Sequence, residues 1–429
     1  MRVELPTVIA TVGGVGTRFY PLTLDRPKPL LTMCGEAVLA RLLESLAYQG
    51  CRDFILATKG SENSRRIKYF FKKGHGFSAA RKLTPFASFR YQCNYEDKGS
   101  GDSVRYNMEY YDIKNDVLVV SGDNIVDVNV MDLIEFHRSK KSFLTVGLKG
   151  VKKDENISQF GVADVDENFK IRKFVEKPKP QEAPSDLINT SVYVFSEEIK
   201  EVFKKMDDKV KDIGHDVIPY LIENNYPVYG QLIGGYWADV GNPGTFLSTT
   251  QDILHGKTGR IRLDESERVG NNLWIDPSTF SRIRDKIGNE IHLEGPVKIG
   301  ADCRLGRNVS IKSSYIGDNV IIEDGAKVNK SVVMDFVKAE VDSTLNGCIV
   351  GDYSIIGRGS RIDVDLPLEI IGGSSDHTPV IGGGVTISSH SVLGPKKRVA
   401  PLRDAHRILT TGRFQELGYD RDNVYFIEI

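Results

Sequence analysis

Residues 8–31 read VIATVGGVGTRFYPLTLDRPKPLL, a short apolar run that breaks into glycines. Gly13, Gly14 and Gly16 carry no Cβ, so the backbone N–H groups around them can close on an anion. The pattern predicts a strand that ends in a phosphate-binding loop.

Two cations follow this loop. Arg18 has a permanent charge and a fork of donors that suits phosphate. Lys28 lies between Pro27 and Pro29, whose rings restrict the backbone φ angles. Two fixed cations beside a glycine turn indicate a triphosphate ligand.

Three other interpretations of the glycine loop fit less well. A P-loop requires Gly-Lys-Ser/Thr, which is absent, and a dinucleotide fingerprint requires a third small residue where Phe19 stands. A glycine turn without a ligand is the third. The ordered series Gly-Gly-x-Gly-Thr-Arg, Pro-Leu-Thr and Pro-Lys-Pro is more specific than such a turn.

This series resembles the N-terminal motif of the sugar-1-phosphate nucleotidyltransferases, also called nucleotide-sugar pyrophosphorylases. The resemblance implies that the nucleotide is bound by Gly13, Gly14, Gly16, Thr17 and Arg18. It also implies catalytic roles for Arg18 and Lys28.

Length and composition limit the number of domains and the class of protein. A chain of 429 residues is too long for one ordinary core and predicts two or three domains. A formal net charge of -1 gives no strong field for nucleic acid or a membrane, and 40% hydrophobic with 27% charged residues is typical of a soluble globular protein. No apolar run approaches the roughly 18 residues of a membrane span, and the N-terminus lacks the apolar core of a signal peptide. We therefore expect a cytoplasmic protein with no nucleic-acid or membrane partner.

The five cysteines are widely spaced, odd in number and without a CxxC pair. This spacing predicts neither a zinc site nor a disulfide framework. We expect them to be buried small hydrophobic residues.

Strand and helix patterns alternate after the glycine loop. Apolar residues at helical spacing over 37–48 precede a strand at 53–58, a helix at 65–73, and strands at 89–93 and 117–120. The alternation predicts a three-layer, Rossmann-like α/β nucleotidyltransferase domain with a mostly parallel sheet, whose ligands gather at the carboxyl ends of the strands.

Residues 98–103, Lys-Gly-Ser-Gly-Asp-Ser, form a second small-residue loop between a predicted strand and helix. Most such loops are turns that cap a helix. Its position matches the base-binding loop of the family, so the resemblance places Gly99 and Ser100 against the nucleobase. The loop is similar to that of glucose-1-phosphate adenylyltransferases, whereas the first motif is nearer the guanylyl and thymidylyl enzymes, which include mannose-1-phosphate guanylyltransferases. The nucleobase stays open.

The strand at 117–120 delivers Gly122-Asp123-Asn124. An aspartate at a strand end is usually a cap or turn residue, but it can also reach the divalent cation that a triphosphate reaction requires. The turn resembles the metal-binding turn of the family, and Asp239 matches its Asp-Val-Gly motif. The resemblance implies that Asp123 and Asp239 hold one Mg²⁺ between nucleotide and sugar phosphate.

Residues 160–163 and 170–177 alternate like paired strands and end at Pro178. Glu176 and Lys177 could simply be charged residues at a solvent-exposed strand end, or they could belong to a binding site. The resemblance implies that Glu176 accepts from sugar hydroxyls and Lys177 binds the sugar phosphate, with Gly161 and Asn189 on the same side.

Residues 189–193, Asn-Thr-Ser-Val-Tyr, match the family pattern Asn-x-Gly-[Ile/Val]-Tyr, except that Ser191 replaces the glycine. This replacement leaves the sugar open, with glucose or mannose 1-phosphate favoured. His215 is near the implied site, where a helix-cap role is favoured over that of a general base, because a sugar phosphate oxygen is already anionic at pH 7.

After a predicted helix at 243–254, residues 256–290 have the glycines, asparagines and proline of a connecting segment. Apolar residues then recur every six positions in four registers, which begin at Ile299, Ile316, Val350 and Ile381. The period predicts a left-handed parallel β-helix of hexapeptide repeats, with loops leaving it at 334–347 and 367–379. The expected domains are therefore catalytic (1–255), linker (256–290), β-helix (291–394) and C-terminal extension (395–429).

Such β-helices also form acyltransferases, whose chemistry generally needs a histidine base. His377 falls in a predicted loop and His390 in a predicted coil, and no convergent set of residues surrounds either. A scaffold that joins copies of the chain into a homo-oligomer is favoured, because a fold alone does not establish a function.

The resulting hypothesis is an enzyme that converts an NTP and a hexose 1-phosphate into an NDP-sugar and pyrophosphate. Two alternatives remain: a bifunctional nucleotidyltransferase and acyltransferase acting on amino-sugar phosphates, and a non-catalytic regulatory subunit. The second is disfavoured because the implied catalytic residues are all present, namely Arg18, Lys28, Asp123, Lys177 and Asp239.

Overall fold

The computed structural model describes residues 5–14, 16–24, 26–94, 96–151, 157–365, 376–401 and 424–427. The chain divides into two compact units. One contains the residues up to Gly14 together with Leu39–Asp239, and the other contains Val15–Val38 and Val240–Ile429. The glycine-rich stretch is therefore shared between the two units, and each unit is described by itself.

The first unit is built on a nine-stranded sheet of order β10-β9-β11-β6-β1-β4-β5, with β8 paired to β11 and β12 to β8. Strands β5, β4, β1 and β6 are parallel, and β11 is antiparallel to β6 and β8. The strands are β1 (Thr7–Val12), β4 (Asp53–Thr58), β5 (Ser88–Tyr91), β6 (Val117–Ser121), β8 (Leu144–Gly150), β9 (Gly161–Val165), β10 (Ile171–Glu176), β11 (Leu187–Phe195) and β12 (Val228–Leu232).

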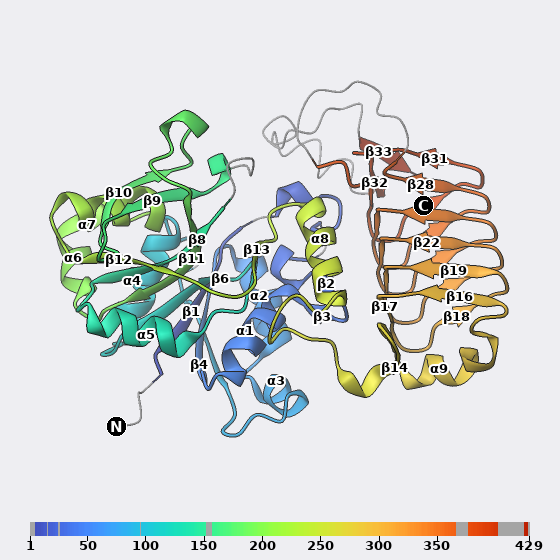
Figure 1. Cartoon of the computed structure of the whole chain (residues 1–429), viewed down its shortest axis with the longest axis horizontal. Coiled ribbons are helices and arrows are strands. Elements are labelled where there is room, and N and C mark those ends of the chain that lie inside the picture. The colour runs from blue at the N-terminus through green and yellow to red at the C-terminus, as the bar shows by residue number, and fades with distance from the viewer. Residues whose placement is uncertain are drawn as a thin grey trace. The chain divides into compact units, whose positions relative to one another are not determined.

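Helices lie on both sides of this sheet (Figure 1). They are α1 (Val38–Tyr48), α2 (Ser61–Phe71), α3 (His75–Ala80), α4 (Ser100–Tyr110), α5 (Val130–Ser139), α6 (Ile199–Met206) and α7 (Ile218–Glu223). The alternation of strand and helix along β1-α1-β4-α2 confirms the predicted Rossmann-like α/β fold.

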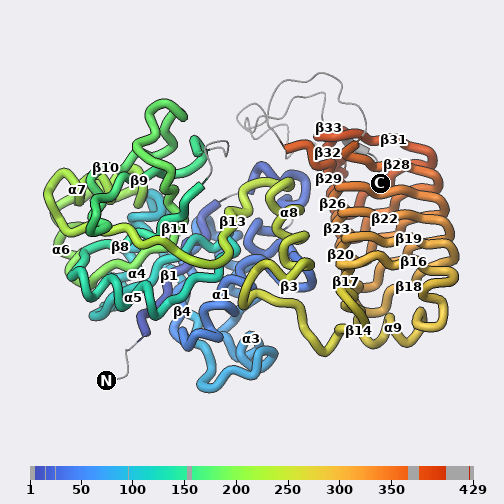
Figure 2. The backbone as a smooth tube through the Cα atoms, viewed as in Figure 1, coloured from blue at the N-terminus to red at the C-terminus, as the bar shows by residue number. Residues whose placement is uncertain are grey.

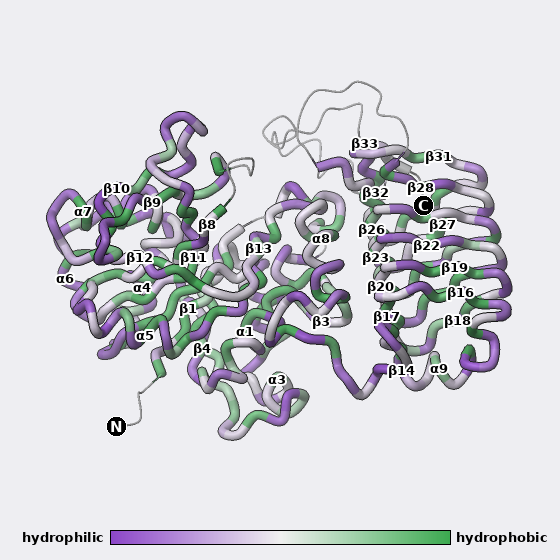
Figure 3. Tube along the Cα trace, in the orientation of Figure 1, coloured by the Kyte–Doolittle hydropathy of each residue, from purple (hydrophilic) through white to green (hydrophobic). Residues whose placement is uncertain are grey.

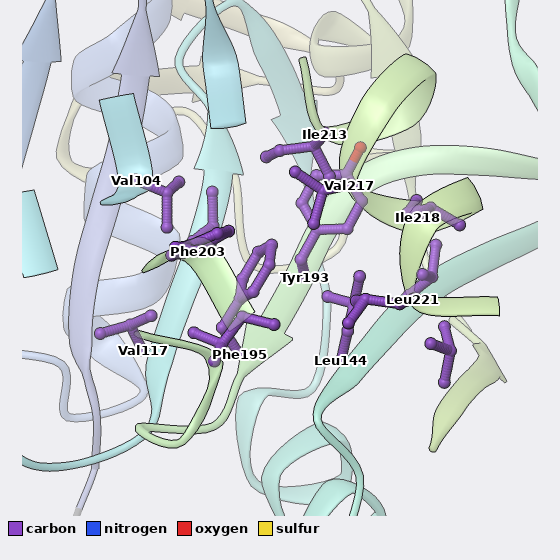
Figure 4. Close-up of a cluster of buried hydrophobic side chains, with 14 of the residues drawn as sticks. Val104, Val117, Leu144, Tyr193, Phe195, Phe203, Ile213, Val217, Ile218 and Leu221 are labelled. Atoms are coloured by element: carbon purple, nitrogen blue, oxygen red, sulfur yellow. The ribbon is translucent and has the colours of Figure 1, made fainter. Parts of the chain in front are cut away.

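A hydrophobic core fills one face of the sheet. Its members come from α4, α6, α7 and most strands of the sheet, and Figure 4 shows Phe203, Tyr193 and Val217 among them. Fully burying one such side chain stabilises the fold by about 1.5–3 kcal/mol. The core therefore anchors β11 and the segment Ile213–Val217, two parts of the chain that also carry polar residues of the candidate site.

The second unit contains a three-sided parallel β-helix whose coils stack on one another (Figure 2). One side has β14 (Arg268–Gly270), β15 (Leu273–Ile275), β17 (Val297–Ile299), β20 (Tyr315–Ile316), β23 (Val332–Val333), β26 (Ile349–Val350), β29 (Val380–Ile381), β32 (Arg398–Pro401) and β33 (Val424–Ile427). The second has β16 (Ile291–Glu294), β19 (Val309–Lys312), β22 (Lys327–Asn329), β25 (Thr344–Asn346), β28 (Arg361–Asp363) and β31 (Val392–Leu393). The third has β18 (Arg304–Leu305), β21 (Ile321–Ile322), β24 (Lys338–Ala339), β27 (Ile355–Ile356) and β30 (Thr386–Ile387).

One regular coil of this β-helix takes 17 residues, because the paired positions of successive coils are 17 apart. The inward residues of one coil fall at Ile316, Ile322 and Val328, and the next coil begins at Val333. Two steps of six are therefore followed by one of five, which explains why the six-residue registers of the sequence break after every third position. Figure 3 shows hydrophobic and hydrophilic residues alternating along these coils.

The predicted loop at 334–347 is wrong. That stretch contains β24 and β25, in which Ala339 and Leu345 take the inward positions. Alanine at an inward position is only weakly apolar, so the six-residue pattern was not recognised in this coil. The other predicted loop, 367–379, lies mostly outside the described residues.

The expected linker, residues 256–290, contains regular structure: β14, β15 and α9 (Pro277–Ile283). Ile275 and Ile283 are buried in the β-helix core, so this stretch covers the first coil. The domain boundaries given above stay a prediction.

Four of the five cysteines are buried as expected, whereas Cys93 is exposed. In the described ranges, every helix is too short or too polar to cross a membrane.

Candidate active site

The parallel strands of the first unit bring two loops to one edge of the sheet. Thr11 of β1 is in register with Ser121 of β6, and the Gly122 N–H donates to the Thr11 carbonyl at 2.8 Å. The loop that starts at Gly13 therefore leaves the sheet beside the turn that carries Asp123. Neighbouring carboxyl ends of this kind are the usual ligand-binding edge of an α/β sheet.

Asp123 and Asp239 are brought together by a short antiparallel pair. Strands β7 (Asn124–Val126) and β13 (Trp237–Asp239) pair so that Asp239 lies opposite Asn124, the neighbour of Asp123. The Ser121 hydroxyl donates to Asp123. Two carboxylates separated by 116 positions of sequence thus share one end of a two-stranded sheet.

This carboxylate pair fits Mg²⁺. The ion prefers oxygen ligands and is commonly held by one or two carboxylates, with water and substrate phosphates completing the octahedron. Across the part of the chain that the structure describes, no three His, Cys, Asp or Glu side chains gather into a metal cluster. Oxygen atoms other than side-chain carboxylates would therefore complete the coordination.

The backbone carbonyl of Thr190 links this pair to the neighbouring strand. It accepts from Asn124 Nδ2 at 3.0 Å and from Trp237 Nε1 at 2.8 Å. The carbonyl is available because the register of β11 with β8 is irregular between Asn189 and Tyr193. Sequence reasoning missed this link, since nothing in the residue types marks the irregularity.

Ser191 lies inside the same irregularity with a φ of 58°, a left-handed conformation that favours glycine. This is the position where the family pattern has glycine. The Ser191 N–H donates to Asn189 Oδ1 at 3.0 Å, which stabilises the turn despite the side chain.

Three of the implied sugar-side residues form a row across β10, β9 and β11. Glu176 pairs directly with Gly161, and Ile188 pairs with Val162, so Asn189 follows at the same level. The Asn189 amide donates to the Tyr193 hydroxyl at 2.8 Å. Burial raises the pKa of Tyr193, so its phenol stays neutral and can donate onward.

Glu176 lies at the β10 end of this row. Burial raises its pKa, and the adjacent Lys177 opposes that rise. A Cβ added to Gly214 would lie 2.5 Å from Glu176 Oε2, so two elements leave room for this carboxylate: the Gly161 strand and the segment around Gly214. Lys177 follows with an exposed side chain, and its Nζ lies 3.8 Å from Glu176 Oε1.

Asp212 links the loop at residues 98–103 to the segment that contains Gly214. Its carboxylate accepts from Ser100 Oγ at 2.8 Å and from the Gly214 and His215 N–H groups, while Ser100 Oγ accepts from the Ile213 N–H. The Ser100 hydroxyl is therefore engaged within the protein. Sequence analysis assigned Asp212 no role in the site; an aspartate at a helix start was the one signal that could have pointed to it.

Gly99 needs to be glycine. Its φ is 151°, and a Cβ there would lie 2.7 Å from the Lys211 carbonyl. His215, by contrast, is exposed and bonded to Asp216, which raises its pKa. The N-cap of the segment Ile213–Val217 is Asp212, and His215 lies in the turn that Asp212 caps.

The remaining predicted residues belong to the second unit. Gly16 has a φ of 69°, and a Cβ there would lie 2.8 Å from the Cβ of Lys28. Gly16 precedes the short helix η1 (Thr17–Phe19), in which Arg18 is exposed. Lys28 begins η2 (Lys28–Leu30), is 8% exposed and has its Nζ 5.7 Å from the centre of the Phe19 ring. Glycine at position 16 thus permits the first motif and the Pro-Lys-Pro motif to pack together.

The fold and this edge define a class of protein, a nucleotide-binding α/β enzyme joined to a parallel β-helix. The chain belongs to the Nucleotidyl transferase family, which residues 7–256 match, and residues 287–407 match the GMPPB C-terminal domain.

Three relatives cover most of the chain. A UTP–glucose-1-phosphate uridylyltransferase of Synechocystis is 27% identical over 82% of this chain and 89% of its own. A mannose-1-phosphate guanylyltransferase catalytic subunit beta of Drosophila melanogaster is 30% identical over 82% and 85%. The bifunctional protein GlmU of Methanococcus vannielii is 24% identical over 83% and 94%.

Proposed function

We propose that the protein joins an NTP to a hexose 1-phosphate, with glucose or mannose 1-phosphate favoured, and releases pyrophosphate. One observation carries the proposal: the Thr190 carbonyl accepts hydrogen bonds from the β7–β13 pair that positions Asp123 and Asp239. Thr190 directly follows Asn189, which is in one row with Gly161 and Glu176. A metal-binding pair beside a row of hydroxyl acceptors suits a phosphorylated sugar. The activities named for the relatives support the same substrate class.

The chemistry is one in-line displacement. An anionic oxygen of the sugar phosphate attacks the α-phosphorus, the bond to the bridging oxygen breaks, and pyrophosphate leaves with its electron pair. Lys177 orients the attacking phosphate, while Arg18 and Lys28 stabilise charge on the α-phosphate and the departing pyrophosphate. Glu176 and Asn189 hold the sugar hydroxyls. Mg²⁺ on Asp123 and Asp239, when bound, neutralises negative charge between the two phosphates.

Gly13, Gly14, Gly16 and Thr17 are proposed to cradle the triphosphate, and Gly99 and Ser100 the nucleobase through their backbone. A panel of the common NTPs against glucose, mannose, galactose and N-acetylglucosamine 1-phosphates, read by pyrophosphate release, identifies both substrates. Release with one pair at least tenfold above the others assigns the base and sugar. No release with any pair contradicts the proposal.

The second candidate is a bifunctional enzyme, for which the relative GlmU is the observation in favour. Acetyl transfer from acetyl-CoA to an amino-sugar phosphate, lost on His377→Ala or His390→Ala, would establish it. We favour a scaffold role instead, with a homo-oligomer formed through the β-helix and a cytoplasmic location. Light scattering on the protein as it elutes from a size-exclusion column measures the number of chains in the oligomer.

Substituting Gly214 with alanine is expected to raise the KM for sugar 1-phosphate about tenfold. The added Cβ meets the flexible end of Glu176 and displaces its carboxylate, so the melting temperature should hardly change. Gly234→Ala is the matched control, because a Cβ there has open space. Equal KM values for the two variants would remove Glu176 from the sugar site.

The raised pKa of Glu176 predicts a pH dependence. Because the folded protein protonates this carboxyl at a higher pH than an ordinary glutamate, the KM for sugar 1-phosphate should start to rise earlier as the pH falls. Glu176→Gln should flatten that rise, whereas Glu182→Gln, on an exposed side chain, should retain it. KM profiles from pH 4.5 to 8 test this; an unchanged profile in Glu176→Gln contradicts it.

A further inference from the structure

Arg26 forms an ion pair with a residue 326 positions away in the sequence. Its Nη2 lies 2.8 Å from Oδ2 of Asp352, and its Nη1 donates to Thr32 Oγ1 at 3.2 Å. Both residues belong to the second unit. Arg26 precedes Lys28 by two residues, and Pro27 between them restricts the backbone.

Asp352 is the third aspartate in a row that runs along the β-helix at 17-residue intervals. In each member Oδ1 accepts a backbone N–H from the preceding coil: Ala301 for Asp318, Asp318 for Asp335, and Asp335 for Asp352, at 2.8 to 3.0 Å. This capping bond uses a single carboxylate oxygen. The bond from Asp352 Oδ2 to Arg26 is therefore additional to what the coil requires.

The same coils are shaped to receive the segment before Arg26. A Cβ added to Gly351 would lie 3.0 Å from Leu22 Cδ2, and one added to Gly382 would lie 2.7 Å from Pro21 Cγ. A cavity of about 410 Å³ adjoins this contact and is lined by Arg26, Asp352 and Tyr353 among others. Side chains of Arg26 and Asp352 are 34% and 18% exposed, so the pair is partly solvated.

We propose that Asp352 and Arg26 are positioning residues for nucleotidyl transfer, through which the β-helix holds the Lys28 segment in place. The inference rests on the proposed function of Lys28. A partly solvated ion pair contributes little to stability. A small displacement of a group that stabilises transferred charge, however, lowers the rate steeply.

Asp352→Asn tests this directly. An amide oxygen can still accept from the Asp335 N–H, whereas the charge that faces Arg26 is lost. We expect kcat to fall about tenfold with KM within twofold, and Arg26→Gln to behave alike. The double variant should be no worse than either single one, because both remove the same interaction. Asp352→Glu, which keeps the charge, should recover part of the rate.

Asp318→Asn is the matched control, since that aspartate makes the same capping bond two coils away. It should keep the wild-type kcat, and all variants should share its melting temperature within a few degrees. Wild-type kcat in Asp352→Asn, or an equal loss of kcat in Asp318→Asn, overturns the proposal. A loss of kcat that simply follows the melting temperature also overturns it.

Hydrogen exchange without substrate separates this inference from the proposed function. The Leu30 and Leu31 N–H groups, bonded to Pro27 and Lys28 carbonyls at 2.8 and 3.0 Å, report on the Lys28 segment. They should exchange faster in Asp352→Asn than in Asp318→Asn. If the wild-type protein releases no pyrophosphate, the proposed function fails. The exchange rates still test whether the Arg26–Asp352 pair holds the Lys28 segment in place. Unchanged exchange at both amides overturns the positioning role.

Discussion

Asp123→Asn and Asp239→Asn are each expected to lower kcat at least about a hundredfold while leaving the melting temperature within a few degrees of wild type. The amide keeps the shape of the carboxylate but lacks its charge, so it binds Mg²⁺ far more weakly. Asp239 ends β13 opposite Asn124 of β7, the neighbour of Asp123, so either substitution should disable the same proposed ion site. Steady-state pyrophosphate release over a Mg²⁺ titration measures the effect.

Asp132→Asn is the control for that experiment, because Asp132 is exposed in the first turn of α5 and shortly follows strand β7. It should retain full turnover. Wild-type turnover in Asp123→Asn or Asp239→Asn at saturating Mg²⁺ would remove that residue from the ion site.

Arg18→Ala and Lys177→Ala are expected to damage different kinetic parameters. If Arg18 meets charge that develops in the transition state, its loss should lower kcat about a hundredfold with little change in KM for NTP. If Lys177 binds the sugar phosphate, as proposed, its loss should raise the KM for sugar 1-phosphate about tenfold and the KM for NTP much less. Initial rates with each substrate varied at saturation of the other give both parameters.

Arg307→Ala and Lys179→Ala, both on exposed side chains, serve as controls and should leave all parameters near wild type. The reverse pattern, with Arg18 governing KM for sugar phosphate and Lys177 governing kcat, would mean that the two half-sites are exchanged.

The α/β domain could be predicted because its signals are local. Leu39, Leu42 and Leu46 repeat at helical spacing, and the strand residues 53–58 are apolar. Parallel strands must end at one edge, so glycine and aspartate after strand ends were expected to gather there. The structure agrees for Gly13 and Asp123.

What the sequence does not reveal depends on long-range register. The meeting of Asp123 with Asp239 was expected only through the resemblance, and the geometry behind it is the β7–β13 pairing. The Thr190 carbonyl is a backbone atom and leaves no trace in residue type. The pair of Arg26 and Asp352 joins positions that the chain separates by an entire domain.

The β-helix shows the same limit in another form. Its six-residue period was visible where isoleucine, valine or leucine points inward, but the five-residue step and an inward alanine at 339 hid one full coil. Stacking requires a side chain of suitable size at that position and does not require a large apolar one.

The reaction proposed for this chain is nucleotidyl transfer from an NTP to a sugar 1-phosphate. The most direct measurement follows pyrophosphate and NDP-sugar together, with the best pair from the substrate panel, in reactions that omit one component at a time. We expect both products in a one-to-one ratio when NTP, sugar 1-phosphate and Mg²⁺ are all present, and neither when any of them is omitted. Folded protein that binds an NDP-sugar but releases no pyrophosphate with any pair would contradict the account and indicate a regulatory subunit.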